Sequence, residues 1–164
     1  ENYLSSESIV KPRQVWWKIR PHMDYGTIEF RICDVQRSLK NVEMITAISQ
    51  ALVYQASKDI ENKCLSESFN LEYLNDGLWK AARFPLKSKM IDPETNIVCT
   101  IADQINKMKN YIHDALIFLD NHHINEYIDL ILTNGTEADK QLKIFDESGF
   151  DILKQYLIKS VEYQ

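Results

Sequence analysis

The chain of 164 residues is poor in residues that break or cross-link a fold, with four glycines, four prolines and three cysteines. Cys33, Cys64 and Cys99 are widely spaced and include no Cys-x-x-Cys pair, so they indicate neither a disulfide framework nor a zinc site. The sequence therefore predicts a protein of the reducing cytoplasm. A chain of this length buries roughly 70% of its unfolded surface, so a core needs no cross-links.

Long apolar runs and basic stripes are also missing. No run approaches the ~20 apolar residues that cross a bilayer, and no basic segment followed by an apolar one opens the chain. We therefore expect a soluble protein with no membrane partner. The formal net charge of -5, with Lys and Arg dispersed, argues against a nucleic-acid partner. The sequence starts at Glu1 without an initiator methionine, which predicts a processed, truncated or partial chain.

The most informative segment that is present runs from Trp16 to Asp34 and reads as two strands joined by a turn at Tyr25 and Gly26. From Thr27 onward its residues alternate between apolar and polar. This period of two predicts one face that enters the core and one polar face. The apolar face carries Ile28, Phe30 and Ile32, and the polar face carries Glu29 and Arg31.

The charges around this hairpin allow more than one interpretation. Arg20 and His22 precede the turn, so a carboxylate, two guanidiniums and an imidazole gather in one place. Such a group suits a site that binds a metal ion and phosphate. A solvated sheet face, with an ordinary cross-strand ion pair between Arg20 and Glu29, is the alternative. His22 either lines a pocket or is a hydrogen-bonded structural residue.

The rest of the chain has helical periodicity, interrupted by one short hairpin, so the fold class is α+β. We divide one domain into a sheet hairpin at 13–34, helices at 38–84, a small hairpin at 88–99 and a helical bundle at 100–163. The first long helix starts at Ser38 or Asn41. The second runs from Leu71 to Arg83, with Leu71, Leu74 and Leu78 facing inward, and Gly77 either interrupts it or packs closely.

Turn and cap signals divide the second half of the chain. Asp92 to Thr95 is a turn signal between two short apolar runs, and Thr100 is a plausible N-cap for a helix that runs to about Leu119. Gly135 ends a helix, Thr136 and Asp139 cap the next, and Gly149 ends that one. The helix after Thr136 is expected to face inward with three residues: Ala138, Leu142 and Phe145.

Four segments in this order resemble the carboxylate-amine ligase family related to type-two glutamate-cysteine ligase. They read GTIEFRICD at 26–34, DGLWKAARF at 76–84, MID at 90–92 and NGTEADKQ at 134–141. The family is similar in fold to glutamine synthetase. The resemblance therefore implies that the chain is the C-terminal portion of such a domain, with part of an antiparallel sheet followed by a helical bundle.

The resemblance also implies roles for five residues. Glu29 would be a magnesium ligand, and Arg31 and Arg20 would be catalytic and would contact phosphate or the substrate carboxylate. His22 and Arg83 would be further substrate or phosphate contacts. The implied cofactors are ATP and Mg2+, and the implied substrates are glutamate and an amine such as cysteine, joined through an acyl phosphate. Phosphoryl transfer of this kind depends on positioning and on charge neutralisation.

The implied partner is the missing N-terminal half of the same protein, which would carry further metal ligands. A second copy of the chain, in a homo-oligomer, is the other partner left open. The chain alone is then expected to be inactive. The alternative function is a noncatalytic α+β binding or scaffold module that retains the fold without activity.

Overall fold

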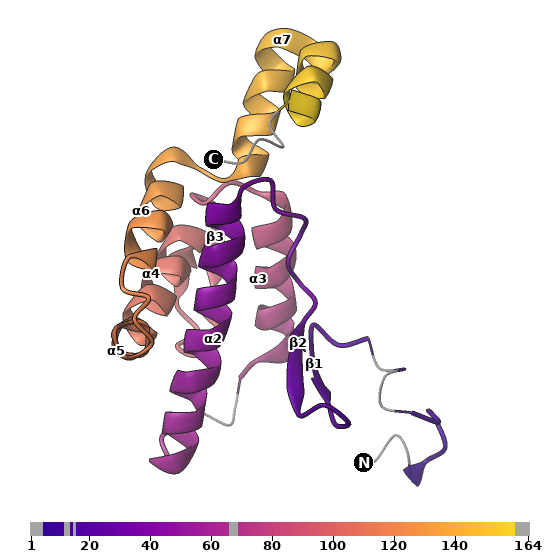
Figure 1. Cartoon of the computed structure of the whole chain (residues 1–164), viewed down its shortest axis with the longest axis vertical. Helices are drawn as coiled ribbons and strands as arrows, with labels where there is room; N and C mark the ends of the chain where they lie inside the picture. The colour runs from indigo at the N-terminus through magenta and orange to yellow at the C-terminus, as the bar shows by residue number, and fades with distance from the viewer. Residues whose placement is uncertain (1–4, 12–13, 15, 66–68, 160–164) are drawn as a thin grey trace. The chain divides into compact units, whose positions relative to one another are not determined.

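The computed structural model describes residues 5–11, 14, 16–65 and 69–159. The chain divides into two compact units, 1–36 and 37–164. Helices and small antiparallel sheets alternate along the chain, as Figure 1 shows, so the α+β class predicted from the sequence is confirmed.

The first unit contains one antiparallel hairpin, formed by β1 (Ile19–His22) and β2 (Thr27–Phe30). Arg20 pairs with Glu29 in its register, and Gly26 takes the positive φ of 61° that the turn requires. The first strand begins at Ile19, later than the start of the hairpin predicted at 13–34. The side chain of Gln14 accepts hydrogen bonds from the backbone of Val10 and Lys11, which turns this segment instead of extending it.

The apolar face of this hairpin is not in a core, which contradicts the sequence expectation. Ile28 is 47% exposed and Ile32 is 53% exposed. Alternation predicts which residues share a face, but burial also needs a second layer, and a two-stranded sheet does not supply one by itself. Trp16 and Trp17 are 82% and 52% exposed.

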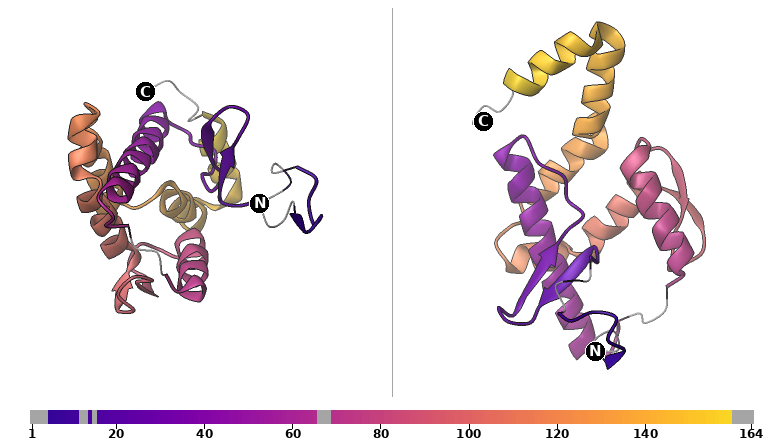
Figure 2. Two further views of the ribbon diagram at one scale, coloured as in Figure 1. Left: turned by 90° about the horizontal axis from the view of Figure 1, so that it is seen from below. Right: turned by 90° about the vertical axis from the view of Figure 1, so that its right-hand side faces the viewer.

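The core of the second unit lies where α2 (Leu39–Glu61) packs against α5 (His113–Phe118) and α6 (Ile124–Asn134). Ala47 and Ala51 face these helices and permit a close approach, and Figure 2 shows α2 running beside α6. The side chain of Ser38 accepts a hydrogen bond from the backbone of Asn41, so Ser38 is the N-cap. The buried cluster consists of Met44, Ala47, Ala51, Ile112, Ala115, Leu116, Ile124 and Ile128.

The small hairpin predicted at 88–99 is present as β3 (Lys89–Ile91) and β4 (Val98–Thr100). It packs against α3 (Leu71–Arg83), whose ends agree with the prediction. Gly77 lies in an uninterrupted helix, and a Cβ placed there would be 2.5 Å from Cε of Met90. Close packing is therefore the reason for a glycine in this helix.

The inward face predicted for α3 is wrong. Leu71 is 69% exposed, Leu74 is 42% exposed and Leu78 is 36% exposed. The helix instead turns Gly77 toward Met90, because only a residue without a side chain allows the backbone this close to β3. The leucine ridge is consequently left at the surface.

The remaining helices begin and end largely where the cap residues predicted. Thr100 and Asp103 form a capping box at the start of α4 (Ile101–Tyr111), and Thr136 and Asp139 exchange equivalent bonds. The helix expected to continue to Leu119 is broken at Ile112, which separates α4 from α5.

The last helix, α7 (Glu137–Lys159), bends at Gly149, where φ is 78°. Gly135, with φ of 84°, ends α6 as predicted. No described residue of α7 is buried, and Leu142 and Phe145 are 57% and 48% exposed, so their predicted inward face is wrong. Among the described residues, no helix combines the length and apolar character that a membrane span requires.

Candidate functional site

The polar face of the hairpin brings together three of the residues singled out in the sequence. Nη2 of Arg20 lies 2.5 Å from Oε2 of Glu29, and Nε of Arg31 lies 3.8 Å from Oε1 of the same carboxylate. The pairing register places Arg20 directly opposite Glu29, and the strand period places Arg31 on the same side. The cross-strand ion pair that the sequence left open as an alternative is therefore formed.

Two guanidinium groups face one carboxylate here, so this group carries a net positive charge. The side chains of Arg20, Glu29 and Arg31 are 17%, 43% and 24% exposed. The guanidinium carbon of Arg31 lies over the Trp16 ring, 5.2 Å from its centre, which is a cation–π contact. Planar, partly exposed guanidiniums suit an anion such as phosphate or carboxylate.

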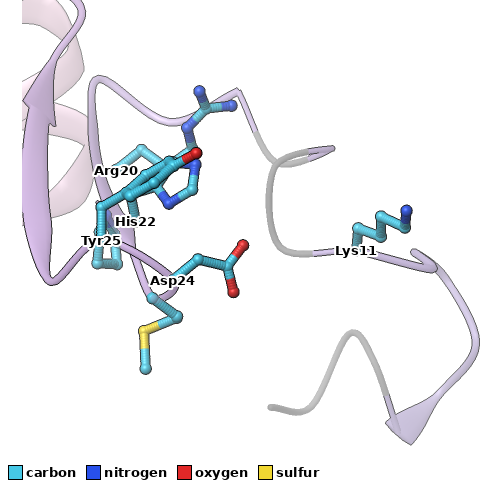
Figure 3. A pocket seen from close by; sticks show the side chains of 7 residues that line it. Lys11, Arg20, His22, Asp24 and Tyr25 are labelled. Carbon is cyan, nitrogen blue, oxygen red and sulfur yellow. The ribbon is translucent and has the colours of Figure 1, made fainter.

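Arg20 also lines a pocket of about 410 Å³ at the turn end of the hairpin. His22 and Tyr25 form one wall, with ring centroids 4.6 Å apart, and Figure 3 shows the two rings against each other. Asp24 lies at the same end, and Lys11 comes from a separate segment. Nδ1 of His22 is buried and has no hydrogen-bond partner within the described part of the chain. His22 therefore lines a pocket, as the first of its two interpretations requires.

Of the seven residues that line the pocket, sequence reasoning singled out only Arg20 and His22. The polar lining residues that it missed are Lys11, Asp24 and Tyr25. Lys11 belongs to a segment without periodicity, which gives no signal of its position. Tyr25 was assigned only to the turn, and Asp24 was assigned no role. Their proximity to Arg20 and His22 along the chain was the one signal that could have included them in the site.

Arg83, the remaining residue predicted for the site, is not on the hairpin. Arg83 is the last residue of α3, in the second unit, and is exposed. A position at the C-terminal end of a helix is favourable for its charge without any ligand. Among the described residues, no group of three or more His, Cys, Asp or Glu side chains is placed to hold a metal ion.

Asp92, within one of the family-like segments, is a buried carboxylate of the second unit with only 6% exposure. It accepts hydrogen bonds from the backbone of Glu94 and Thr95 and, at 2.7 Å, from Nζ of Lys107. Burial alone would raise the pKa of Asp92, but these hydrogen bonds outweigh burial and hold the pKa well below its ordinary value. The network joins the turn of the small hairpin to α4, which is a structural role.

The model of glutamate-cysteine ligase family 2 (GCS2) matches residues 3–154 of this chain. The chain belongs to glutamate-cysteine ligase family 2. This assignment covers the hairpin, the small hairpin with Asp92 and the helices up to the second half of α7.

Curated relatives within the family carry glutamate-cysteine ligase 2 in their names as a provisional assignment. The relative from Solibacter usitatus is 31% identical over 99% of this chain and 44% of its own length. Those from Herpetosiphon aurantiacus and Gloeobacter violaceus are 29% and 32% identical, over 38% and 39% of their own lengths. The chain therefore spans less than half the length of each of these relatives.

Proposed function

We propose that this chain supplies part of the active site of an ATP-dependent carboxylate-amine ligase with a glutamine synthetase-like fold. The enzyme joins the γ-carboxylate of glutamate to an amine such as that of cysteine through an acyl phosphate. The observation that carries the proposal is the convergence of Arg20, Glu29 and Arg31 on one face of the hairpin. Membership of the glutamate-cysteine ligase family supports the class of reaction.

An unactivated carboxylate does not form an amide at neutral pH because hydroxide is a poor leaving group. Bound ATP supplies a phosphoryl group that makes the carboxylate reactive. The part of this chain is to position that group and to neutralise its charge. Arg31 offers a bidentate fork on the open polar face, and Arg20 offers a second guanidinium at the pocket wall.

The surroundings of Glu29 fit one ligand of a magnesium site. Oε2 lies 2.5 Å from Arg20, whereas the contact of Oε1 to Arg31 is longer, at 3.8 Å. Magnesium in phosphoryl-transfer sites is commonly held by one or two carboxylates together with phosphate oxygens and water. Glu29 can therefore contribute one oxygen and hold Arg20 in position with the other.

The pocket beside Arg20 contains charges of both signs, which suits an amino acid. Arg20 and Lys11 are donors for a carboxylate, and Asp24 is an acceptor for an ammonium group. The rings of His22 and Tyr25 cover one side of the space between them. In the proposed function, this pocket binds the glutamate end of the reaction.

A second candidate function is a noncatalytic binding module. The observation that favours it is that both oxygens of Glu29 face guanidinium groups, as they would in a purely structural ion-pair network. In that case Glu29 stabilises the hairpin and ligates nothing. The two functions differ in what the loss of its charge does to ATP turnover.

The test uses a joined chain, in which this chain replaces the matched part of the Solibacter usitatus relative. ADP release is measured with glutamate, cysteine and Mg-ATP. We expect Glu29→Gln to lower release by about 100-fold or more while circular dichroism stays unchanged. The matched control is Glu43→Gln, since Glu43 is also a half-exposed carboxylate, with 48% exposure and a contact to His123.

Two results would contradict the ligase proposal. Undiminished release in Glu29→Gln would remove the metal role of this carboxylate. No release from the unchanged joined chain, with any amine tried, would favour the noncatalytic module.

A further inference from the structure

The bend of α7 depends on the backbone of one residue. Among the described residues of this helix, Gly149 alone departs from helical geometry, with φ of 78° and ψ of -179°. This combination is essentially restricted to glycine. Figure 2 shows the two halves of α7 meeting at an angle. If Gly149 took helical geometry, α7 would become one straight helix of 23 residues, about 35 Å long.

A straight α7 would carry a continuous stripe of mainly apolar residues, which the bend divides. The members of this α7 stripe follow one another in steps of four and three residues, the repeat by which two helices pair side by side. In the bent form, Leu142, Phe145 and Ile152 are each about half exposed. The sequence of α7 therefore suits a straight helix with a partner helix. The α7 stripe consists of Ala138, Leu142, Phe145, Gly149, Ile152 and Tyr156.

The bent form contains polar contacts that a straight α7 cannot make within one chain. The Tyr156 hydroxyl donates to Glu137 at 2.9 Å, and Arg37 donates to the Tyr156 carbonyl at 2.8 Å. Glu137 and Tyr156 are 19 residues apart, which corresponds to about 28 Å along a straight helix. Straightening therefore separates these groups, and the second half of α7 from another copy presents the same groups in the same order.

We propose that α7 is a two-state arm, bent within a single chain and straight in a dimer of two copies that exchange residues 150–159. In this dimer, Arg37 of each copy binds the Tyr156 carbonyl of the other, so the contacts of the bent form are kept. The two straight helices pair antiparallel along the α7 stripe. The apolar side chains that are exposed in the single chain are thereby covered.

The positions of the contacts agree with an antiparallel pair that crosses at Gly149. Such a crossing places Tyr156 of one copy beside Leu142 of the other, since both residues lie the same number of positions from Gly149. In the bent form, the Tyr156 ring already lies 4.9 Å from Nζ of Lys140. Both forms therefore place this ring beside the same turn of α7. The proposal does not depend on the ligase reaction.

The first experiment measures the dissociation constant of the dimer by sedimentation equilibrium in the unchanged chain and in Gly149→Ala. A Cβ at position 149 has no atom within 4 Å, so alanine penalises the bent form only through its positive φ. We expect a bias of about tenfold for each copy, and hence a dissociation constant about 100-fold lower. The matched control is Gly26→Ala, since Gly26 also has a positive φ and open space around it, and it should leave the constant unchanged.

The second experiment measures the shape of α7 in the dimer. Spin labels are placed on cysteines at positions 143 and 159, after Cys33, Cys64 and Cys99 are replaced by serine, and labelled chains are diluted with unlabelled ones. The distance within one copy should be about 24 Å in the dimer, as in a straight helix, and shorter in the single chain.

Three results would overturn the proposal. The first is a Gly149→Ala chain that associates no more tightly than the unchanged chain or than Gly26→Ala. The second is a dimer in which the distance between the labels stays short, because α7 is then bent. The third is a dimer of the 164-residue chain that is absent from the joined chain, since the α7 stripe would then belong to a contact within the longer protein.

A further variant keeps the test decisive if alanine at position 149 disturbs folding. Phe145→Glu should raise the dissociation constant of the dimer by about tenfold or more, because the pairing of the α7 stripe buries the new charge. The matched control is Phe150→Glu, since Phe150 is also exposed but lies outside the α7 stripe, and it should leave the constant unchanged. Equal effects of the two variants would count against pairing along this stripe.

Discussion

The guanidinium of Arg37 lies 4.2 Å from the centre of the Tyr156 ring, although 119 residues separate them in the sequence. Its Nη1 donates to Glu137 at 2.9 Å, and its Nη2 donates to the carbonyl of Tyr156 at 2.8 Å. The Tyr156 hydroxyl donates to the same Glu137 carboxylate at 2.9 Å. Arg37 thus joins the two halves of α7 across the bend at Gly149.

We predict that Arg37→Met loosens the second half of α7. No described residue of α7 is buried, so these polar contacts contribute much of the stability that holds its two halves together. Loss of charge-assisted hydrogen bonds costs about 1.5–3 kcal/mol, which should speed amide hydrogen exchange in residues 150–159 by tenfold or more. Lys143→Met, on the first half of α7 and 72% exposed, is the control. Unchanged exchange in Arg37→Met would show that other contacts hold the bend.

A second prediction concerns the acid stability that Asp92 provides. The lowered pKa of Asp92 means that its stabilising contribution is present above its unfolded pKa of about 3.9 and is lost as pH falls below it. Asp92→Asn should cost about 2 kcal/mol at pH 7 and should flatten the loss of stability below about pH 4. Urea unfolding at several pH values measures both effects. Asp146→Asn, at an exposed position, should change neither the stability at pH 7 nor its loss in acid. If Asp92→Asn lost stability below pH 4 as steeply as the unchanged chain, the assignment would be refuted.

The contact between Gly77 and Met90 leads to a third prediction. Alanine is favoured over glycine in a helix by about 1 kcal/mol, but a Cβ at position 77 meets the Met90 methyl group at 2.5 Å. Gly77→Ala should therefore gain less than this amount in the unchanged chain and should gain it in full in a Met90→Ala background. A double-mutant cycle on the free energy of unfolding measures the difference. Equal gains in both backgrounds would mean that the Met90 side chain moves aside without cost.

A fourth prediction concerns Tyr111, whose hydroxyl donates to Asp59 at 2.5 Å. Burial and this hydrogen bond raise the pKa of Tyr111 to about 12. Because the folded pKa is raised, this group stabilises the fold below the unfolded pKa of about 10, and the contribution is lost as pH rises toward 12. In Asp59→Asn, the pKa should fall but stay above its ordinary value, since burial remains. NMR titration of labelled tyrosine measures it, and a Tyr111 pKa that does not fall in Asp59→Asn would contradict this account.

Local sequence signals predicted where helices begin and end better than they predicted which side chains are buried. Ser38, Thr100 and Gly135 act within one helical turn, so a cap or stop residue is recognisable from its neighbours alone. The burial of Ile28 and Leu71 depends instead on what lies across from them. Periodicity identifies an apolar face but does not say whether a layer covers it, and in these two cases none of the described residues does so sufficiently.

The candidate site also contains residues that the sequence predicted and residues that it did not. The group of Arg20, Glu29 and Arg31 follows from strand alternation and a short turn, so it was predictable as a set. Lys11 reaches the pocket from a segment without periodicity, which only coordinates could reveal. The roles of these residues in binding ATP, magnesium or glutamate stay predictions that the experiments above test.

The alignment of β1 with β2 constrains the length of the connection between them as well as its composition. Because neighbouring side chains alternate sides, inserting or deleting one residue between His22 and Thr27 would place Arg20 beside Ile28 or Phe30. The charged trio would then be split between opposite surfaces although every amino acid was retained. Natural variation in this loop should accordingly favour substitutions over changes in residue count.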